Sequence, residues 1–244
     1  MIIDGHVHIG TSSYFHMQAD ADFLVRQADA AGFDRLFVTD LNALFYDMSE
    51  GNDALANELA KHPDRLIGYA SVPTPRLGQR AVDEVRRCHE MYGMRGLKIY
   101  SLPEAPIAEP MTYPLLEVAA ELNMPVLAHT TPDECDHLMT HVPQVRLVMA
   151  HMGGHPWAKG DWHRAIAVAK AHRNLLLDTA SSQIDNGMLE RAVAELGAEK
   201  IVFGTDMPLL DPHTQFAKVR GADLPDEAKA LILGGNYARI LGLT

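Results

Sequence analysis

The sequence has few cysteines and no long apolar run. Only Cys88 and Cys135 are cysteines among 244 residues, and they form no C-x-x-C or zinc-ribbon spacing, so we expect two free thiols. No unbroken apolar stretch approaches the roughly 20 residues that span a bilayer. No basic segment precedes the first apolar run, as one would in a signal peptide. We therefore expect a cytoplasmic protein that does not enter a membrane.

Positive charge is also scarce. The chain has 21 Lys and Arg against 32 Asp and Glu, which gives a formal net charge of −11 at pH 7, and no basic cluster offsets it. Such a chain repels phosphate backbones and anionic lipid surfaces. We therefore expect a small-molecule substrate as the partner, and neither nucleic acid nor a membrane. The loops between the expected elements are short, which leaves open whether a second subunit completes the pocket in a homo-oligomer.

Linkers, low-complexity tracts and internal repeats are absent, and a regular alternation fills the chain instead. Eight short apolar runs recur about every 30 residues, the length of one strand–helix unit. They cover residues 1–9, 34–40, 66–72, 95–100, 124–130, 145–151, 174–180 and 200–206. Amphipathic segments lie between them at 21–32, 80–93, 113–123, 163–172 and 188–197, and a last helical layer is expected at 225–243.

Eight such units predict an α/β fold, a (β/α)₈ TIM barrel formed as one domain by residues 1–244. A doubly wound open sheet is the alternative. It is disfavoured because the first strand is not followed by the glycine-rich phosphate loop typical of that fold.

Polar side chains stand at the ends of several of these runs. In a (β/α)₈ barrel the active site forms at the carboxyl ends of the strands. The residues found there are His6, His8, Lys98, His129, His151 and Asp206. His6 and His8 point the same way because side chains alternate along a strand, and Asp4 lies one step deeper. An H-x-H pair alone is weak evidence, but this convergence of nitrogen and oxygen donors indicates a metal site.

The motifs carrying these residues resemble a known family. "IDGHVHIG", "GLKIY", "LAHT", "MAHMGG" and "FGTDMP", followed by "GGNYARILGL", are similar to the amidohydrolase superfamily, and within it to the amidohydrolase-2 branch that includes aminocarboxymuconate-semialdehyde decarboxylase. The resemblance covers nearly the whole chain. It implies a barrel with a divalent metal, usually zinc, held by His6, His8, His129 and Asp206.

Chemical roles can be assigned to three of the acids and bases. Asp206 can bind the metal through one oxygen and take the proton of an activated water with the other. His151 is suited to hold that water or to polarise a substrate oxygen. Asp4 is expected to fix the imidazole of a ligand, with a buried structural role as the alternative.

Lys98 has three interpretations. It could be carbamylated and bridge two metals, as in two-metal members of the superfamily. It could bind a substrate carboxylate as an ammonium, or pair with Asp206 or another acid inside the barrel. Tyr100 and Trp157 are expected to line the pocket with it, and the weaker candidates are His16, Tyr46, His155 and His213.

Together these residues favour a metal-dependent hydrolase that acts on an ester, lactone or amide of a small carboxylated molecule. One Zn²⁺ is the expected cofactor, with Mn²⁺ or a two-metal centre as alternatives. A metal-dependent decarboxylase of an aromatic or unsaturated acid stays open, since the same ligands serve both reactions. A non-catalytic metal-binding barrel is disfavoured, because Asp206 and His151 supply acid–base capacity that structural metal binding does not need.

Overall fold

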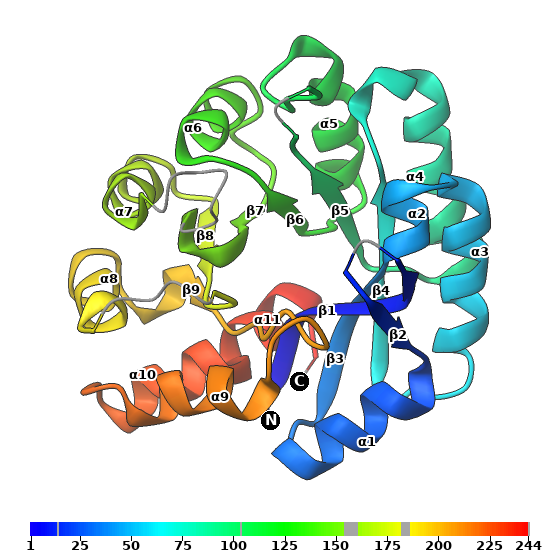
Figure 1. The fold of residues 1–244 in the computed structure, drawn as a ribbon. Coiled ribbons are helices and arrows are strands. Elements are labelled where there is room, and N and C mark those ends of the chain that lie inside the picture. The colour runs from blue at the N-terminus through cyan, green and yellow to red at the C-terminus, as the bar shows by residue number, and fades with distance from the viewer. Residues whose placement is uncertain (14, 103, 154–160, 182–185, 244) are drawn as a thin grey trace.

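The computed structural model describes residues 1–13, 15–102, 104–153, 161–181 and 186–243. Its centre is a sheet with the strand order β2-β1-β3-β4-β5-β6-β7-β8-β9. Figure 1 shows the strands gathered at the middle of the molecule and the helices around them. The strands are β1 (Ile3–Ser12), β2 (Met17–Ala19), β3 (Arg35–Asp40), β4 (Leu66–Val72), β5 (Gly96–Tyr100), β6 (Val126–His129), β7 (Leu147–Met149), β8 (Leu175–Asp178) and β9 (Ile201–Val202).

All neighbouring strands are parallel except β1 and β2, which form an antiparallel pair. The sheet closes on itself where the segment after β9 meets β1. Gly5 N donates to Phe203 O at 2.9 Å, Asp206 N to His6 O at 2.8 Å, and His8 N to Met207 O at 2.7 Å. Each of the eight expected runs contains one parallel strand, and the predicted barrel is confirmed. The hairpin partner β2 was not predicted from the sequence.

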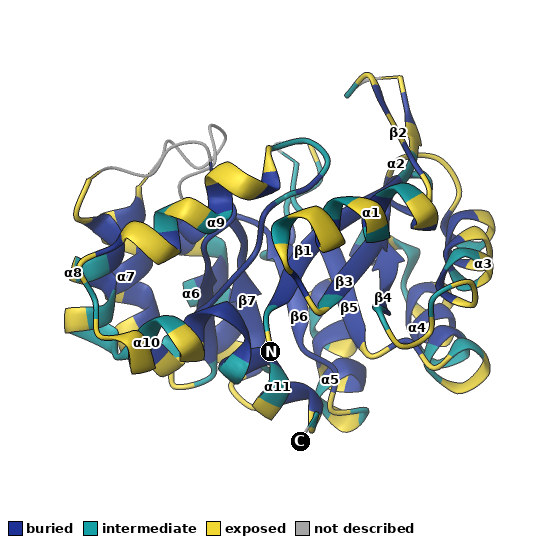
Figure 2. Cartoon of the chain, turned by 90° about the horizontal axis from the view of Figure 1, so that it is seen from below, coloured by how far each residue is buried: buried dark blue, intermediate teal, exposed yellow. Residues whose placement is uncertain are grey.

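The helices cover the outside of the barrel, with their exposed faces turned to solvent (Figure 2). They are α1 (Ala21–Ala31), α2 (Leu41–Phe45), α3 (Met48–Leu59), α4 (Gln79–Tyr92), α5 (Tyr113–Glu121), α6 (Pro132–His141), α7 (Trp162–Ala171), α8 (Met188–Leu196), α9 (Pro212–Gly221), α10 (Asp226–Ala230) and α11 (Asn236–Leu241). A π-helical turn, η6 (Leu231–Gly235), joins α10 to α11, so the layer expected at 225–243 is three short pieces.

Local sequence signals explain where the helices begin and end. Asp20 caps α1 by accepting the Phe23 amide, and Gly32 ends the helix in the left-handed conformation that glycine adopts without steric cost. Thr131 and Glu134 form a capping box at the start of α6. Such caps satisfy backbone groups that the helix itself leaves unpaired.

Two apolar clusters make up the core. The larger one lies between the strands and the helices. The smaller one fills the amino-terminal part of the barrel and includes Phe37, Tyr69 and Tyr237. Cys88 and Cys135 are buried free thiols, as expected. In the ranges that the structure describes, no helix combines the length and apolarity needed to cross a bilayer.

Candidate metal centre

His6, His8 and Asp206 converge at the carboxyl end of the barrel. The Nε2 atoms of His6 and His8 lie 3.5 and 2.8 Å from Asp206 Oδ1, and the three residues each offer a ligand atom within 4.8 Å of the other two. Both imidazoles are buried, while the Asp206 side chain keeps 14% of its surface exposed. Two strand-one nitrogens and one carboxylate oxygen from beyond the last strand could therefore hold a divalent ion.

Asp178, at the end of β8, fixes the orientation of His6. Its Oδ2 lies 2.5 Å from His6 Nδ1, and both side chains are buried. Because a carboxylate can only accept, Nδ1 carries the proton and the lone pair of Nε2 is available to the proposed ion. Burial raises the pKa of Asp178 to about 6. Asp178 was not predicted from the sequence, although it lies within the apolar run at 174–180 and is the last residue of β8.

The protonation states of the trio suit a metal ion. Burial lowers the pKa of His6 well below its usual range, with the Lys98 charge acting in the same direction, and burial also lowers the pKa of His8. Burial alone would raise the pKa of Asp206, but the hydrogen bond with His8 and the nearby imidazoles outweigh it and the pKa falls. Neutral imidazoles and an ionised carboxylate are the forms that bind metals.

A buried polar atom supports the same conclusion. His8 Nδ1 has no hydrogen-bond partner among the described residues, although it is buried. A buried nitrogen without a partner is costly. The three residues thus fit a divalent cation better than they fit a self-contained hydrogen-bond network.

His151 lies beside this trio in a constrained backbone. Its ring centroid is 5.1 Å from that of His6, and its Nδ1 donates a short hydrogen bond to Ala180 O. A carbonyl oxygen only accepts, so in the neutral ring Nε2 is the acceptor. His151 and Asp206 both have left-handed backbones, with φ of 61° and 62°. Such conformations in residues other than glycine are uncommon and concentrate at functional sites.

His129 lies between Tyr100 and His151. Its ring stacks on Tyr100 with a centroid separation of 3.9 Å and an interplanar angle of 2°, and it meets His151 edge-on at 5.3 Å. It is not part of the group whose ligand atoms lie within 4.8 Å of one another. Its expected role as a metal ligand stays a prediction. Tyr100 is half-buried, and its expected role in lining the pocket also stays a prediction.

Lys98 is buried in the barrel, with Nζ 3.3 Å from His6 Nε2. Burial lowers its pKa to about 8, while the charges of Asp206 and Asp178 act to raise it. The described residues include no contact ion pair between Lys98 and Asp206, so the two carboxylates act on it through space. The amine forms no contact ion pair with any described acid, and its roles as a bridging carbamate or as a substrate-binding ammonium stay predictions.

Asp4 supports the backbone of the site, not an imidazole. Its oxygens accept hydrogen bonds from the Thr205 hydroxyl at 2.5 Å, the Thr205 amide at 2.9 Å and the His6 amide at 3.2 Å. Burial raises its pKa to about 7 despite these bonds. The expected contact with a ligand imidazole is made by Asp178 instead, because Asp4 is turned to the loop that carries Asp206.

The weaker candidates are exposed or lie outside the described residues. His16 and His213 are exposed, and Tyr46 is 64% exposed. Trp157 and His155 lie outside the described residues. Of the two aromatic residues expected to line the pocket, the structure therefore locates only Tyr100.

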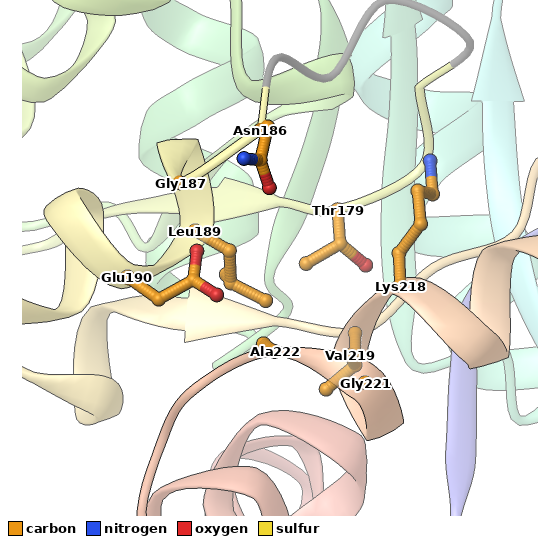
Figure 3. Close-up of a pocket in the computed structure, with 9 residues that line it drawn as sticks. All are labelled: Thr179, Asn186, Gly187, Leu189, Glu190, Lys218, Val219, Gly221 and Ala222. Atoms are coloured by element: carbon orange, nitrogen blue, oxygen red, sulfur yellow. The ribbon is translucent and has the colours of Figure 1, made fainter.

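A separate cavity of about 310 Å³ lies behind β8, between α8 and α9. Figure 3 shows Lys218 and Glu190 on opposite sides of it. Lys218 Nζ donates to Ser181 O, and burial lowers the pKa of Lys218 to about 8. Thr179 lines this cavity, whereas the preceding residue, Asp178, faces His6, as alternation along a strand requires. The cavity is therefore on the other side of the strand from the metal centre.

Comparison with solved structures gives the same fold with several chemistries. The chain matches a dihydroxybenzoic acid decarboxylase from Polaromonas sp. JS666 with bound manganese and 2-nitroresorcinol (TM-score 0.81, 18% identity, 99% of this chain and 97% of that one). It matches 4-oxalomesaconate hydratase from Rhodopseudomonas palustris (0.73, 18%, 99% and 96%). It also matches a probable 2-pyrone-4,6-dicarboxylic acid hydrolase from Acinetobacter baumannii with bound citric acid (0.72, 16%, 99% and 99%).

At these identities the solved structures establish the shared barrel only. The family is established by a sequence model described as amidohydrolase, Amidohydro_2, which matches residues 3–243. Because that match spans nearly the whole chain, the protein belongs to the amidohydrolase family of metal-dependent enzymes.

Proposed function

We propose that the protein hydrolyses an ester, lactone or amide bond in a small carboxylated molecule, using one zinc ion per chain. The ion would be held by His6, His8 and Asp206, with His129 as the further ligand that the resemblance implies. The observation that carries the proposal is the position of the two Asp206 carboxylate oxygens. Its Oδ1 lies among the imidazoles, whereas its Oδ2 makes no hydrogen bond to another described residue.

The side chains around Asp206 provide the other requirements of hydrolysis. When bound, the metal would supply the Lewis acidity that activates a water molecule for attack. Asp206, kept ionised by its neighbours, accepts the proton of the attacking water and delivers it to the leaving group. His151 offers an acceptor nitrogen, because its Nδ1 proton is committed to Ala180 O, and this favours holding the water over polarising a carbonyl. Lys98, as an ammonium, is placed to bind a carboxylate of the substrate.

Decarboxylation is the second candidate, and an aromatic row favours it. Tyr100 lies between His129, on which it stacks, and Phe45, which it meets edge-on with ring centroids 5.3 Å apart. Phe15 extends the row, 5.9 Å from Phe45. Flat aromatic faces beside a metal centre suit a planar unsaturated acid, and one solved relative in fold is a decarboxylase of such an acid.

An isotope experiment separates the two reactions. The zinc- or manganese-loaded enzyme is screened against lactones, esters and aromatic carboxylic acids, and any active substrate is then turned over in ¹⁸O-labelled water while carbon dioxide is measured. Hydrolysis places label in a new carboxylate and releases no carbon dioxide. Stoichiometric carbon dioxide without label would overturn the hydrolase in favour of the decarboxylase. Asp206→Asn serves as the inactive control in both assays.

A further inference from the structure

A second cavity with an unusual charge lies at the end of the barrel opposite the metal centre. Its volume is about 840 Å³, and α11 forms one of its walls. Figure 2 shows α11 and the chain's carboxyl end at this side of the molecule, far from β2 and α2. Five cationic side chains and one carboxylate line it: Arg95, Arg146, Arg173, Lys200 and Arg239, with Glu199. This concentration occurs in a chain whose net charge is −11.

The topology of the barrel brings these cations together. Arg95, Arg146 and Lys200 each immediately precede a strand, namely β5, β7 and β9, and Arg173 precedes β8 by two residues. Since parallel strands all begin at the same end of a barrel, residues just before them share one rim. Arg239 joins them from α11. Positions far apart in the sequence therefore contribute to a single positively charged rim.

Part of this charge has a structural explanation. Arg95 donates to Leu241 O, and Arg146 donates to Ile240 O at 3.1 Å, so both cap the last carbonyls of α11. Lys200 Nζ donates to His172 O at 2.6 Å and Arg173 O at 2.8 Å, after α7. Arg146 also donates to Asn123 Oδ1, and Arg239 donates to Glu199 O at 3.3 Å and to Asn236 Oδ1 at 3.1 Å. All of these acceptors are neutral, and the bonds use only a fraction of the five N–H donors of each guanidinium.

These bonds leave the positive charge of the rim without a counter-charge. None of the five cations forms an ion pair with a carboxylate within the described parts of the chain, and the Arg173 side chain has no hydrogen-bond partner there. Some arginines on the helices are paired with carboxylates, as Arg86 is with Glu121 at 2.6 Å and Arg164 with Asp133 at 2.9 Å. Burial also lowers the pKa of Lys200 to about 8, with only Glu199 acting to raise it. Like charges gathered without counter-charges indicate an anionic partner.

We propose that this cavity is a binding site for a small molecule that carries two or more phosphate or carboxylate groups, with Arg173 and Arg239 as its main contacts. Guanidinium groups match both kinds of oxyanion in a planar, bidentate geometry. The volume lies in the range of ligand pockets and exceeds what a single inorganic ion requires. The site is independent of the hydrolase proposal, because the whole barrel separates it from His6 and Asp206.

Isothermal titration at low salt with inorganic pyrophosphate and with citrate tests the site. Both probes also chelate metals, so the titrations are repeated in the His6→Ala/His8→Ala variant, in which only the new site would remain. Arg173→Gln should weaken binding at least about tenfold and the Arg173→Gln/Arg239→Gln pair further, as loss of charge-assisted bonds predicts. Arg35→Gln, at the start of β3 and outside this cavity, is the matched control and should bind like the parent.

The probes also distinguish the anion class, since the tighter of the two identifies phosphate or carboxylate as the preferred group. Added salt should weaken binding of both. Arg173→Gln removes no bond that the fold uses, so it stays informative even if the double variant unfolds. Binding that is unchanged by Arg173→Gln, lost in the His6→Ala/His8→Ala variant, or absent for both probes in the parent would overturn the proposal.

Discussion

The two ends of the barrel use their interior in opposite ways. At the carboxyl end the interior holds His6, His8 and Asp206. Asp206 and the neighbouring His151 have a left-handed backbone. At the amino end it is filled by rings. Phe37 stacks on Tyr69 with centroids 3.6 Å apart, and the Tyr69 hydroxyl donates to Gly5 O at 2.9 Å.

The difference indicates that the amino end of the barrel stabilises the fold, whereas the carboxyl end gives up stability. Apolar rings with satisfied hydroxyls favour the folded state, whereas buried charges and strained backbone disfavour it. Substitutions at the carboxyl end should therefore reduce metal binding and turnover more than they reduce stability. Substitutions at the amino end should do the reverse.

The largest expected effect is loss of the metal in His6→Ala/His8→Ala. The parent should carry about one zinc or manganese ion per chain, and the variant essentially none, because two of the three converging ligands are gone. Elemental analysis of the purified proteins measures this. His16→Ala/His213→Ala, two exposed histidines, should keep the metal. A variant that retains stoichiometric metal without His6 and His8 would show that the site lies elsewhere.

At the amino end, Tyr237→Ala should lower the free energy of unfolding by about 3–5 kcal/mol, the cost of removing a buried aromatic ring. The melting temperature should fall by roughly 10 °C. Metal content should be unchanged at temperatures where the variant is folded. Tyr46→Ala removes the same ring from a side chain that is 64% exposed and should have little effect. A Tyr237→Ala protein as stable as the parent would contradict the division between the two ends.

Asp40, at the carboxyl end of β3, should make stability depend on pH. It caps α2, and burial raises its pKa to about 6 from 3.8. The folded state then binds the proton more tightly than the unfolded state, so stability falls as pH rises from about 4 to 6. Across that window the free energy of unfolding of Asp40→Asn should rise by up to about 3 kcal/mol relative to that of the parent.

Denaturant unfolding at pH 4, 5, 6 and 7 measures this difference. Asp47→Asn, at the exposed cap of α3, is the control for loss of a capping carboxylate. If the difference in free energy of unfolding between Asp40→Asn and the parent does not change with pH, burial does not disfavour the ionised Asp40 carboxylate.

His151→Asn should retain the metal but lose about 10²-fold in turnover, the scale of a positioned acid–base group. Asparagine tolerates the left-handed conformation at this position, so the backbone should persist. Elemental analysis and kcat are measured together, with the exposed His141→Asn as control. Loss of the metal instead would make His151 a ligand and favour a two-metal centre with carbamylated Lys98, which adds a mass increment on the lysine.

The smallest effect is expected for Asp178→Asn, which should weaken metal affinity about tenfold, because the carboxylate orients a ligand without touching the ion. Competition with a chelator measures it. Asp136→Asn is the matched control, since Asp136 makes the same kind of contact with His172, at 2.7 Å, on the outer helices. Equal metal affinities in the parent and in Asp178→Asn would show that the contact between Asp178 and His6 is purely structural.

The sequence was sufficient to predict the barrel and the approach of His6, His8 and Asp206, because strand periodicity and strand ends fix which side chains share one rim. Asp178 was missed for a different reason. Three leucines precede it in the run at 174–180, and nothing local shows that its carboxylate faces the His6 imidazole across the barrel. The choice between Asp4 and Asp178 depends on the loop after β9, which turns Thr205 toward Asp4.

The closure of the barrel has a consequence for how the protein acquires its metal during synthesis. His8 and Asp206 are 198 residues apart, and the backbone bonds that close the sheet join the same two segments. A nascent chain that lacks the last strand has the two histidines but not the carboxylate, and its two ends are not yet held together. The set of ligands is therefore complete only after the barrel has closed, so that metal loading reports completion of the fold.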